Sequence, residues 1–353
     1  MNERQTRVLA RIDPTRTAGL EIGPLDRPLV TREMGPIAYV DRATTAQLRQ
    51  HYEGDPGVNA DQIVDVDFVH GNRPLVESVG RADFEYVVAS HAVEHFPDVV
   101  GWLRQVAGVL RVGGILSLVI PDKRFTFDYL RPTSSPSEMI DAHFWTSSRP
   151  TFRQVFEGLA VSVDLDLDKA WSGSVDIREL AFRHTEEAAL NFARRAMEGE
   201  YVDAHCWVFT PQSFFDALRF FIRMDLFDYR VVSFIDTPRA ELEFYVALEK
   251  LPPTSDQIRR QSDQLASIPV QEQPERRNRV LPHLGLDDTE GLQVVCAERD
   301  EAREELERAL AELAEERRFG LRRWAIEHPW SDRLRLALPQ RWGLLDRAMK
   351  DRW

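Results

Sequence analysis

The chain has 353 residues, of which 43% are hydrophobic and 29% are charged, an ordinary composition for a globular protein. Its formal net charge of −13 argues against sequence-independent binding to nucleic acid, which requires a positive surface. The sequence shows no apolar run long enough for a membrane span, and its first residues do not resemble a secretion signal. The only cysteines, Cys206 and Cys296, suit neither a disulfide framework nor a zinc cluster. We therefore expect a cytoplasmic protein.

The first third of the chain alternates short apolar segments with helical or turn-rich ones. Nearly continuous apolar character is typical of strands buried on both faces of a parallel sheet, and it predicts strands at 17–22, 36–40, 63–66, 84–90 and 115–120. Between the last two, apolar residues recur at helical spacing from 99 to 110, and Gly113 and Gly114 are predicted to end this helix. Strands that alternate with helices predict a doubly wound α/β sheet.

The alternation lapses between about 125 and 205, where prolines, serines, aromatic residues and acids are scattered. We interpret this stretch as an insertion over the sheet that forms the substrate side of the site. The sheet pattern returns with an amphipathic helix at 211–224 and with strands at 229–235 and 242–248. These two strands are too close in sequence for a helix between them, so they should pair antiparallel. The main domain is therefore predicted to span 1–250.

A linker rich in proline and glutamine is predicted at 251–290, followed by a helical, amphipathic extension at 291–353. Its first part, 291–318, contains a short heptad-like seam. This seam suits a coiled coil in a homo-oligomer, or equally a single helix that packs on the domain. The residues of the seam are Ala302, Leu306, Ala309 and Leu313.

The last segment, 321–353, interleaves tryptophan with arginine. This combination suits a peripheral contact with the anionic inner face of a membrane, where the rings lie at the depth of the headgroups. Packing of the same side chains against protein is the alternative, and the sequence leaves both open.

Acidic residues stand where the first three predicted strands end, the edge at which open α/β sheets bind ligands. Glu21 closes the first strand, Asp41 closes the second, and Asp67 follows the third. The position of Asp41 suits a carboxylate that accepts hydrogen bonds from ribose hydroxyls, and Asp67 could face an adenine amino group. In this order on successive strands, the three acids favour a nucleoside ligand.

The neighbours of these acids complete the predicted ligand site. Gly23 and Pro24 follow Glu21, and the glycine lets the backbone pass close to a ligand, while Phe68 beside Asp67 offers an apolar contact. The first loop lacks the second and third glycines of a pyrophosphate-binding loop. The pattern therefore favours a nucleoside that carries no phosphate.

Four ordered segments carry a family resemblance. They are Leu-Glu-Ile-Gly-Pro (20–24), Tyr-Val-Asp (39–41), Phe-Glu-Tyr-Val-Val-Ala-Ser-His-Ala-Val-Glu-His (84–95) and Leu-Arg-Val-Gly-Gly-Ile-Leu (110–116). Together they resemble the motifs of class I S-adenosylmethionine-dependent methyltransferases. With the element pattern, the resemblance predicts a Rossmann-like, doubly wound α/β sheet of seven strands, mostly parallel with one antiparallel strand. It implies S-adenosylmethionine as the cofactor.

The resemblance also assigns residues. By match to the family motifs, the cofactor would be held by Glu21, Gly23, Asp41 and Asp67, with Ser90 and His91 near its sulfonium. In one departure, the family's usual Gly-x-Gly loop reads Gly23-Pro24-Leu25 here. Methyl transfer by in-line displacement depends mainly on positioning, and we expect a general base to deprotonate the acceptor hydroxyl. The candidate catalytic residues are Asp122, His205 and His91.

The segments at 120–128 and 205–211 are similar to a bacterial subgroup associated with glycosyltransferases and surface-polysaccharide assembly. This implies an O-methyltransferase that acts on a sugar hydroxyl of a glycan or glycolipid precursor. Two alternatives stay open. One is methylation of a small phenolic or lipid-like metabolite, and the other is a catalytically silent cofactor-binding protein that acts through its helical tail.

The segment His91-x-x-Glu94-His95 resembles the Glu-x-x-Glu-His segment that binds magnesium in ubiquinone-biosynthesis O-methyltransferases. A histidine at the first position suits a softer ion better than magnesium, which prefers oxygen ligands. Glu94 and His95 can equally begin the next helix with local hydrogen bonds. Because the sulfonium is already the electrophile, we expect no metal and a turnover that EDTA leaves intact.

Overall fold

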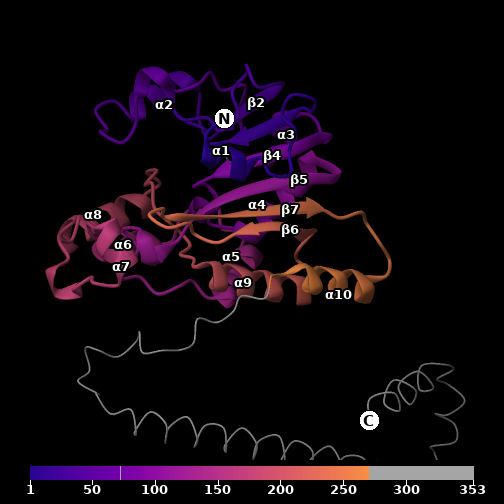
Figure 1. Ribbon diagram of the computed structural model, residues 1–353. Helices are drawn as coiled ribbons and strands as arrows, with labels where there is room; N and C mark the ends of the chain where they lie inside the picture. Colours follow the sequence, from indigo (N-terminus) through magenta and orange to yellow (C-terminus); the bar gives the residue numbers. More distant parts are fainter. Residues whose placement is uncertain (72, 270–353) are drawn as a thin grey trace, which may run out of the picture. The chain divides into compact units, whose positions relative to one another are not determined.

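Seven strands form one sheet in the computed structural model, which describes residues 1–71 and 73–269 (Figure 1). They are β1 (Gly19–Ile22), β2 (Ile37–Asp41), β3 (Phe68–Val69), β4 (Phe84–Ser90), β5 (Leu110–Pro121), β6 (Tyr229–Ile235) and β7 (Glu243–Lys250). Their order across the sheet is β3-β2-β1-β4-β5-β7-β6, and β7 alone runs in the direction opposite to the other six strands. The predicted mostly parallel seven-stranded sheet is confirmed.

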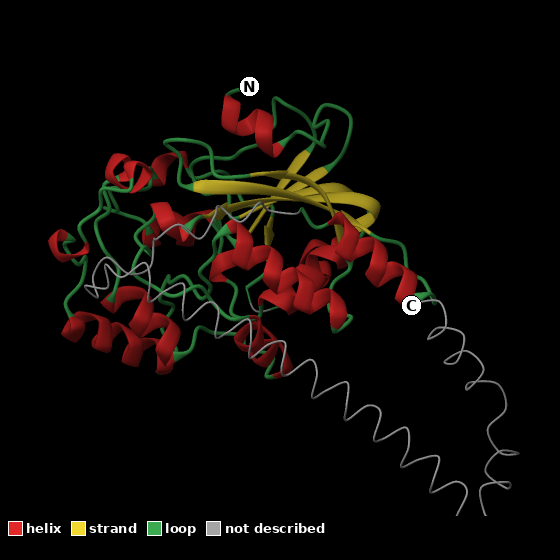
Figure 2. Ribbon diagram, turned by 60° about the horizontal axis from the view of Figure 1, so that its bottom comes forward, coloured by secondary structure: helices red, strands yellow, loops and turns green. Residues whose placement is uncertain are grey.

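Helices cover both faces of the sheet (Figure 2). On one face, α1 (Glu3–Val8) packs Val8 into a core that includes Tyr39 and Tyr245. The larger core on the other face is built by α3 (Leu75–Val79), α4 (Val99–Val109), α5 (Pro136–Phe144), α9 (Pro211–Arg223) and α10 (Gln257–Ser267). The short α2 (Thr45–His51) and the 3-10 helix η1 (Ala60–Gln62) lie between β2 and β3 in the chain. This double covering explains why the strands read as almost continuously apolar.

The remaining helices of the insertion form a separate group. They are α6 (Phe152–Ala160), α7 (Leu167–Ser172) and α8 (Glu186–Met197), with the 3-10 helix η4 (Ile177–Glu179) between the last two. Val155, Ala193 and Ala196 give this group a small core of its own. In Figure 1 these helices lie beside the sheet, whereas α5 belongs to the main helical layer through its packing on α4 and α9. Only part of the predicted insertion is therefore separate from the sheet domain.

The third strand is two residues long and lies later than predicted. Residues 63–66 form no strand, because the N–H of Val64 bonds to the carbonyl of Leu25 and that of Val66 to Oγ1 of Thr45. Ile63 is buried, at 1% exposure, but as part of a loop. The apolar pattern thus indicated the burial of Ile63 correctly and the pairing of the segment incorrectly.

The prediction that Gly113 and Gly114 end a helix is also wrong. The helix α4 ends at Val109, and the two glycines lie inside β5, where the pairing with β4 shifts register between Phe84 and Tyr86. Gly113 has φ +76°, and a Cβ on Gly114 would lie 2.9 Å from the carbonyl oxygen of Arg111. The glycines therefore permit a bulge in the strand.

The linker was predicted to begin at residue 251, which is too early, because α10 lies within this range and packs on β6 and α9. Gln264, at 1% exposure, donates from Nε2 to the carbonyls of Phe227 and Tyr229. The rest of the linker, the heptad-like seam and the 321–353 segment lie outside the described residues. Within the described residues, no helix is both long enough and apolar enough to span a bilayer.

Candidate functional site

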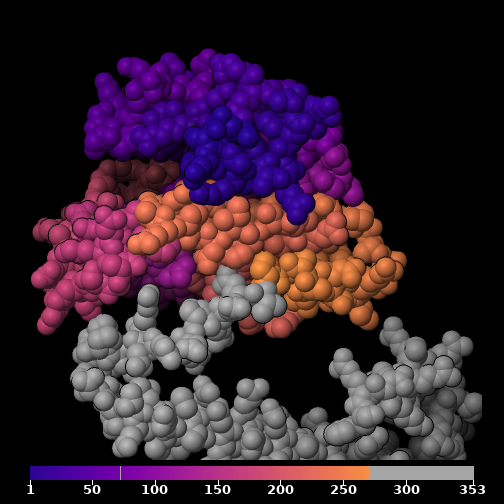
Figure 3. Space-filling view, in the orientation of Figure 1, coloured from indigo at the N-terminus to yellow at the C-terminus, as the bar shows by residue number. Residues whose placement is uncertain are grey.

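A pocket of about 540 Å³ lies at the carboxyl ends of β1, β2, β3 and β4. Figure 3 shows it as a hollow between the indigo and purple N-terminal part and the magenta insertion. Residues between 148 and 150 and between 196 and 204 line its insertion side. Its volume lies in the range of about 300–1,000 Å³ that is usual for small-molecule sites. The residues that line it at the strand ends include Gly23, Asp41, His70, Gly71 and His91.

A larger cavity, about 1180 Å³, lies at the opposite edge of the sheet. Its charged residues are largely paired with one another, as in the ion pairs of Arg111 with Glu85 and of Arg230 with Glu249. Open α/β sheets bind ligands outside the carboxyl ends of their strands. We therefore take the smaller pocket as the candidate functional site.

The backbone around the pocket is left-handed at several positions. Gly23 (φ +65°), Leu25 (φ +46°), Gly71 (φ +51°) and His91 (φ +49°) all line it. Such angles are uncommon outside glycine, and strained residues of this kind cluster at ligand sites. Leu25 occupies the position of the second glycine of a Gly-x-Gly loop and adopts the left-handed conformation that a glycine would readily take. The loop therefore keeps this turn despite the leucine.

Asp41 ends β2 on the wall of this pocket, at 7% exposure. Its Oδ1 accepts a hydrogen bond from the N–H of Arg42 at 2.7 Å. Burial raises the pKa of Asp41 to about 6. Beside it, the guanidinium of Arg42 lies 3.7 Å from the ring centroid of Tyr201, which links the strand end to the insertion side of the pocket.

Glu21 is buried next to the same loop, but it is not among the residues that line the pocket. Its two carboxylate oxygens accept the N–H groups of Leu29 and Val30, at 2.8 and 3.0 Å. Burial raises the pKa of Glu21 to about 7, although these hydrogen bonds oppose the rise. The predicted ligand-binding acid therefore holds the loop after β1 in place. Pro24 is buried within that loop, also outside the pocket lining.

Asp67 and Phe68 do not line the pocket either. Since β3 begins at Phe68, Asp67 precedes the strand instead of following it. Its carboxylate bonds to Arg32 and accepts the N–H of Tyr39, while Phe68 packs against the main core. The residues that actually follow β3 into the pocket are His70 and Gly71. Asp67 lies before the strand instead of after it because the position of the strand was predicted incorrectly.

Ser90 and His91 lie at the end of β4 within a polar network. The Nε2 of His91 is 2.7 Å from Oε2 of Glu243, and Arg4 bonds to both Glu243 and the hydroxyl of Ser90. Burial favours a neutral Glu243, but the contacts with His91 and Arg4 outweigh it and lower the pKa to about 2. His91 thus enters the pocket as the histidine of a histidine–carboxylate pair.

Asp122 is fully buried and outside the pocket lining. It precedes the 3-10 helix η3 (Lys123–Phe125), and its carboxylate accepts hydrogen bonds from the backbone and side chain of Arg124 and from the hydroxyl of Thr237. These partners occupy both of its oxygens. The geometry therefore does not support Asp122 as a general base.

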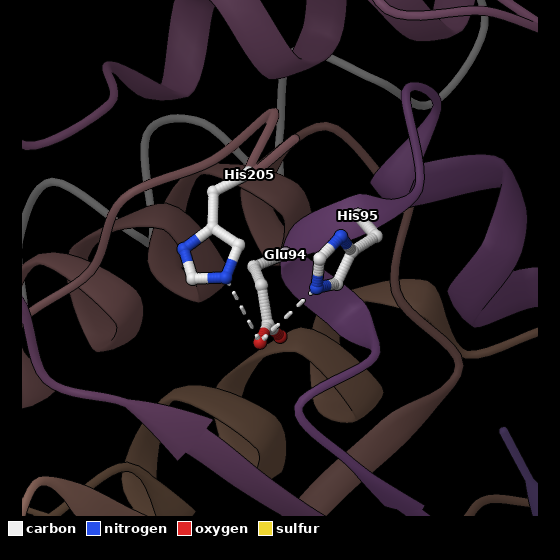
Figure 4. A group of neighbouring side chains, drawn as sticks. All are labelled: Glu94, His95 and His205. Atoms are coloured by element: carbon white, nitrogen blue, oxygen red, sulfur yellow. Dashed lines mark ion pairs between the residues drawn. The ribbon is translucent and has the colours of Figure 1, made fainter. Parts of the chain in front are cut away.

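His205 belongs to a cluster with Glu94 and His95 next to the pocket (Figure 4). Its Nδ1 lies 2.5 Å from Oδ2 of Asp128, and its Nε2 faces Glu94. Glu94 and His95 come from the 3-10 helix η2 (Val93–His95), and Nδ1 of His95 lies 2.9 Å from Asp203. Burial opposes the charged form of His95, but the carboxylates of Asp203 and Glu94 outweigh it and raise the pKa to about 9.

The sequence pattern missed several residues of this region. Arg42, Tyr201 and Asp203 line the pocket, and Glu243 supports it from β7. Arg42 directly follows a predicted site residue, which is a weak signal. The others lie far away in the sequence, and no local spacing connects them to the early strand ends.

No protein-family model matches the sequence, and no curated protein has significant similarity to it. Solved structures are similar at the level of the fold. A candidate zinc-dependent alcohol dehydrogenase from Rhodobacter sphaeroides is 13% identical, with a TM-score of 0.41 over 71% of this chain and 91% of that one. A SAM-dependent methyltransferase from Methanosarcina mazei is 14% identical, with a TM-score of 0.35 over 70% and 97%.

The 1,6-didemethyltoxoflavin-N1-methyltransferase of Burkholderia thailandensis, solved with S-adenosylhomocysteine, is 15% identical, with a TM-score of 0.35 over 70% of this chain and 76% of that one. At these identities and TM-scores, the similarities assign neither a family nor an activity to the chain.

Proposed function

We propose that the chain is an S-adenosylmethionine-dependent methyltransferase. The observation that carries the proposal is the Asp41 carboxylate at the end of β2, in a pocket of about 540 Å³ beside the left-handed Gly23–Leu25 loop. A buried carboxylate in this position suits the two hydroxyls of a ribose. The ordered sequence motifs at 20–24, 39–41, 84–95 and 110–116 support the same cofactor.

For the reaction, we propose O-methylation of a sugar hydroxyl in a glycan or glycolipid precursor. The polar residues of the insertion side, among them Arg149, Glu200 and Tyr201, support a polar acceptor that enters from there. Methylation of a small phenolic or lipid-like metabolite remains the alternative. A catalytically silent cofactor-binding protein would have the same pocket without turnover.

His91 is the best supported general base of the three sequence candidates. It lines the pocket, and Glu243 holds its Nε2, which leaves Nδ1 as the nitrogen that can accept a proton. A carboxylate partner of this kind fixes the orientation of the ring and stabilises the imidazolium that forms. Asp122 and His205 both lie outside the pocket lining, and hydrogen-bond partners occupy both carboxylate oxygens of Asp122.

Calorimetry with S-adenosylmethionine and S-adenosylhomocysteine tests the cofactor. Asp41→Ala should weaken binding by roughly ten- to a hundred-fold, because hydrogen bonds to a charged group are lost. Asp67→Ala is the matched control, since the carboxylate of Asp67 lies outside the pocket lining. This substitution should leave the affinity unchanged. Equal affinities of the wild type and Asp41→Ala would contradict the proposal.

Turnover is tested separately with labelled S-adenosylmethionine and a panel of lipid-linked sugars, nucleotide sugars and phenols. Transfer of label to a sugar, lost in His91→Gln with cofactor binding retained, is the expected result. Transfer to phenols alone would favour the alternative acceptor. Cofactor binding without transfer to any member of the panel would favour the catalytically silent protein.

A further inference from the structure

We propose that Glu94, His95 and His205 form a binding site for a divalent first-row transition metal ion, of the type that Zn²⁺ occupies. The ligand atoms are Nε2 of both histidines and a carboxylate oxygen of Glu94, and all lie within 4.8 Å of one another (Figure 4). The site adjoins the pocket, because His95 lines it together with Asp203. This inference does not depend on the proposed methyl transfer.

Glu94 gives the first argument. Its side chain is fully buried, and neither carboxylate oxygen has a hydrogen-bond partner. The ion-pair contacts of its carboxylate are with Nε2 of His95 at 3.8 Å and with Nε2 of His205 at 3.9 Å. Both distances exceed the range of about 2.7–3.2 Å for an N–H···O bond. Because a buried carboxylate without a partner is strongly unfavourable, the position calls for a cation between these three side chains.

The orientation of the histidines gives the second argument. In each imidazole, Nδ1 faces a carboxylate, at 2.5 Å from Asp128 for His205 and at 2.9 Å from Asp203 for His95. Both Nε2 atoms point toward Glu94 (Figure 4). Histidines that bind metals usually hold a carboxylate with one ring nitrogen and the ion with the other. Two histidines arranged in this way around one carboxylate match that pattern.

The charges of the cluster give the third argument. Glu94, Asp128 and Asp203 carry three negative charges, and among the described residues Arg131 is the one arginine or lysine within ion-pair distance of them, 2.8 Å from Asp128. Two further positive charges would balance the cluster. A divalent ion supplies both.

The donor set selects the ion. Two imidazole nitrogens and one carboxylate suit Zn²⁺ and its first-row neighbours, while Mg²⁺ prefers oxygen ligands throughout. Ligand atoms about 2.0–2.2 Å from a tetrahedral ion lie about 3.3 Å apart, so the three side chains must close slightly on binding. Glu94 can move, because no hydrogen bond holds its carboxylate. Three protein ligands leave a fourth position for water or for a ligand from the pocket.

The sequence alone led to a different set. It grouped His91 with Glu94 and His95, but His91 is turned to Glu243, and His205 arrives instead from the far side of the insertion. The sequence predicts no metal in this protein. The proposed site departs from that prediction because of the cluster that the fold assembles.

Binding is tested on the full chain after dialysis against EDTA, by calorimetry with Zn²⁺, Co²⁺ and Mg²⁺ salts alone. We expect one equivalent of Zn²⁺ and of Co²⁺ to bind, with Mg²⁺ unable to compete. Glu94→Gln and His205→Gln should abolish this binding or weaken it by more than about a hundred-fold, and Asp203→Asn by about ten- to a hundred-fold. His143→Ala is the matched control, because His143 also pairs with a carboxylate, Asp98, but lies outside the cluster. This variant should bind Zn²⁺ as the wild type does.

X-ray absorption on the Zn²⁺-loaded wild type needs no variant and decides the case if a substitution prevents folding. The expected spectrum shows two imidazole nitrogens and an oxygen ligand at about 2.0–2.2 Å. No stoichiometric binding by the wild type would overturn the site and leave a polar cluster without an ion. Unchanged binding in a folded Glu94→Gln, or a spectrum with a sulfur ligand, would move the ion elsewhere in the chain.

Discussion

Asp41 and Glu21 are both buried carboxylates near the ends of neighbouring strands, and they differ in what they face. Glu21 accepts two backbone N–H groups of the loop after β1, whereas Asp41 lies on the wall of the pocket. Burial raises the pKa of both. For Glu21 the consequence concerns folding, and for Asp41 it concerns ligand binding.

Cofactor affinity should depend on pH through Asp41. Burial raises its pKa to about 6, and an ionised carboxylate is the better acceptor for ribose hydroxyls. The affinity for S-adenosylhomocysteine should therefore be constant above about pH 7 and fall by up to about ten-fold per unit below pH 6. Calorimetry from pH 5 to 8 measures this, and Asp41→Asn should remove most of the slope. An equal slope in wild type and variant would assign the titration to another group.

Folding stability should depend on pH through Glu21. Its pKa of about 7 in the folded state, set mainly by burial, lies above the ordinary value of 4.5, so the folded protein retains a proton that the unfolded chain has lost. The contribution of Glu21 to stability is therefore greatest below about pH 4.5 and falls, by up to about 3 kcal/mol, as the pH rises to about 7.

Urea unfolding of the wild type and of Glu21→Gln at pH 5 and pH 8 measures this effect. Other groups titrate equally in both proteins, so the difference between them isolates Glu21. The stability of Glu21→Gln relative to the wild type should improve between pH 5 and pH 8. A difference that stays constant would mean that Glu21 is ionised throughout this range.

A site residue can be predicted when the sequence pattern that marks it lies in the residues next to it. Gly23 and Asp41 end strands whose apolar pattern is strong, and both line the pocket as the sequence indicates. Asp67 was misplaced because its strand, of only two residues, is too short to give a reliable pattern. The partner of His205, Asp128, comes from another part of the chain. Pairings of this kind depend on tertiary packing, which spacing in the sequence does not encode.

At the scale of elements, α10 shows how a segment with a weak pattern is held in place. Its composition suggests a linker, yet Gln264 is buried and bonds to two carbonyls at the start of β6, while Ile268 packs into the main core. Because prolines precede this helix and polar residues lie within it, its hydropathy pattern does not predict that it packs on the sheet domain. The strands β4, β5, β6 and β7 were predictable because their runs are long and apolar.

Gln264→Ala should destabilise the protein by about 1–3 kcal/mol, since two buried carbonyls lose their donor. Chemical unfolding followed by circular dichroism measures the change. Ile258→Ala on the same helix is the control, because Ile258 is 84% exposed and its removal should change the stability by less than about 0.5 kcal/mol. Similar small effects of both substitutions would show that α10 contributes little to the fold.

At the scale of the molecule, the pocket lies where two distant parts of the chain meet. The ends of β1 to β4 supply one wall and residues 196–204 supply the other, linked by Arg42 and the ring of Tyr201. Two tryptophans of the insertion lie away from the pocket. Trp145 is 76% exposed, and Trp171 stacks on Phe125, so neither lines the pocket. Tyr201 is the aromatic residue of the insertion that does.

The segment 321–353, which lies outside the described residues, carries a prediction from its sequence alone. A protein with a net charge of −13 is repelled by an anionic membrane, so any attraction must come from a local basic segment. Arginine and tryptophan alternate here in a way that suits phosphate headgroups and the interface.

Full-length protein should therefore co-sediment with vesicles that contain anionic lipid, and a chain ending at Arg318 should not. Because the contact is electrostatic, moderate salt should weaken it, and vesicles of neutral phosphatidylcholine should bind little. Equal sedimentation of the two chains at low salt would mean that these side chains pack against protein instead.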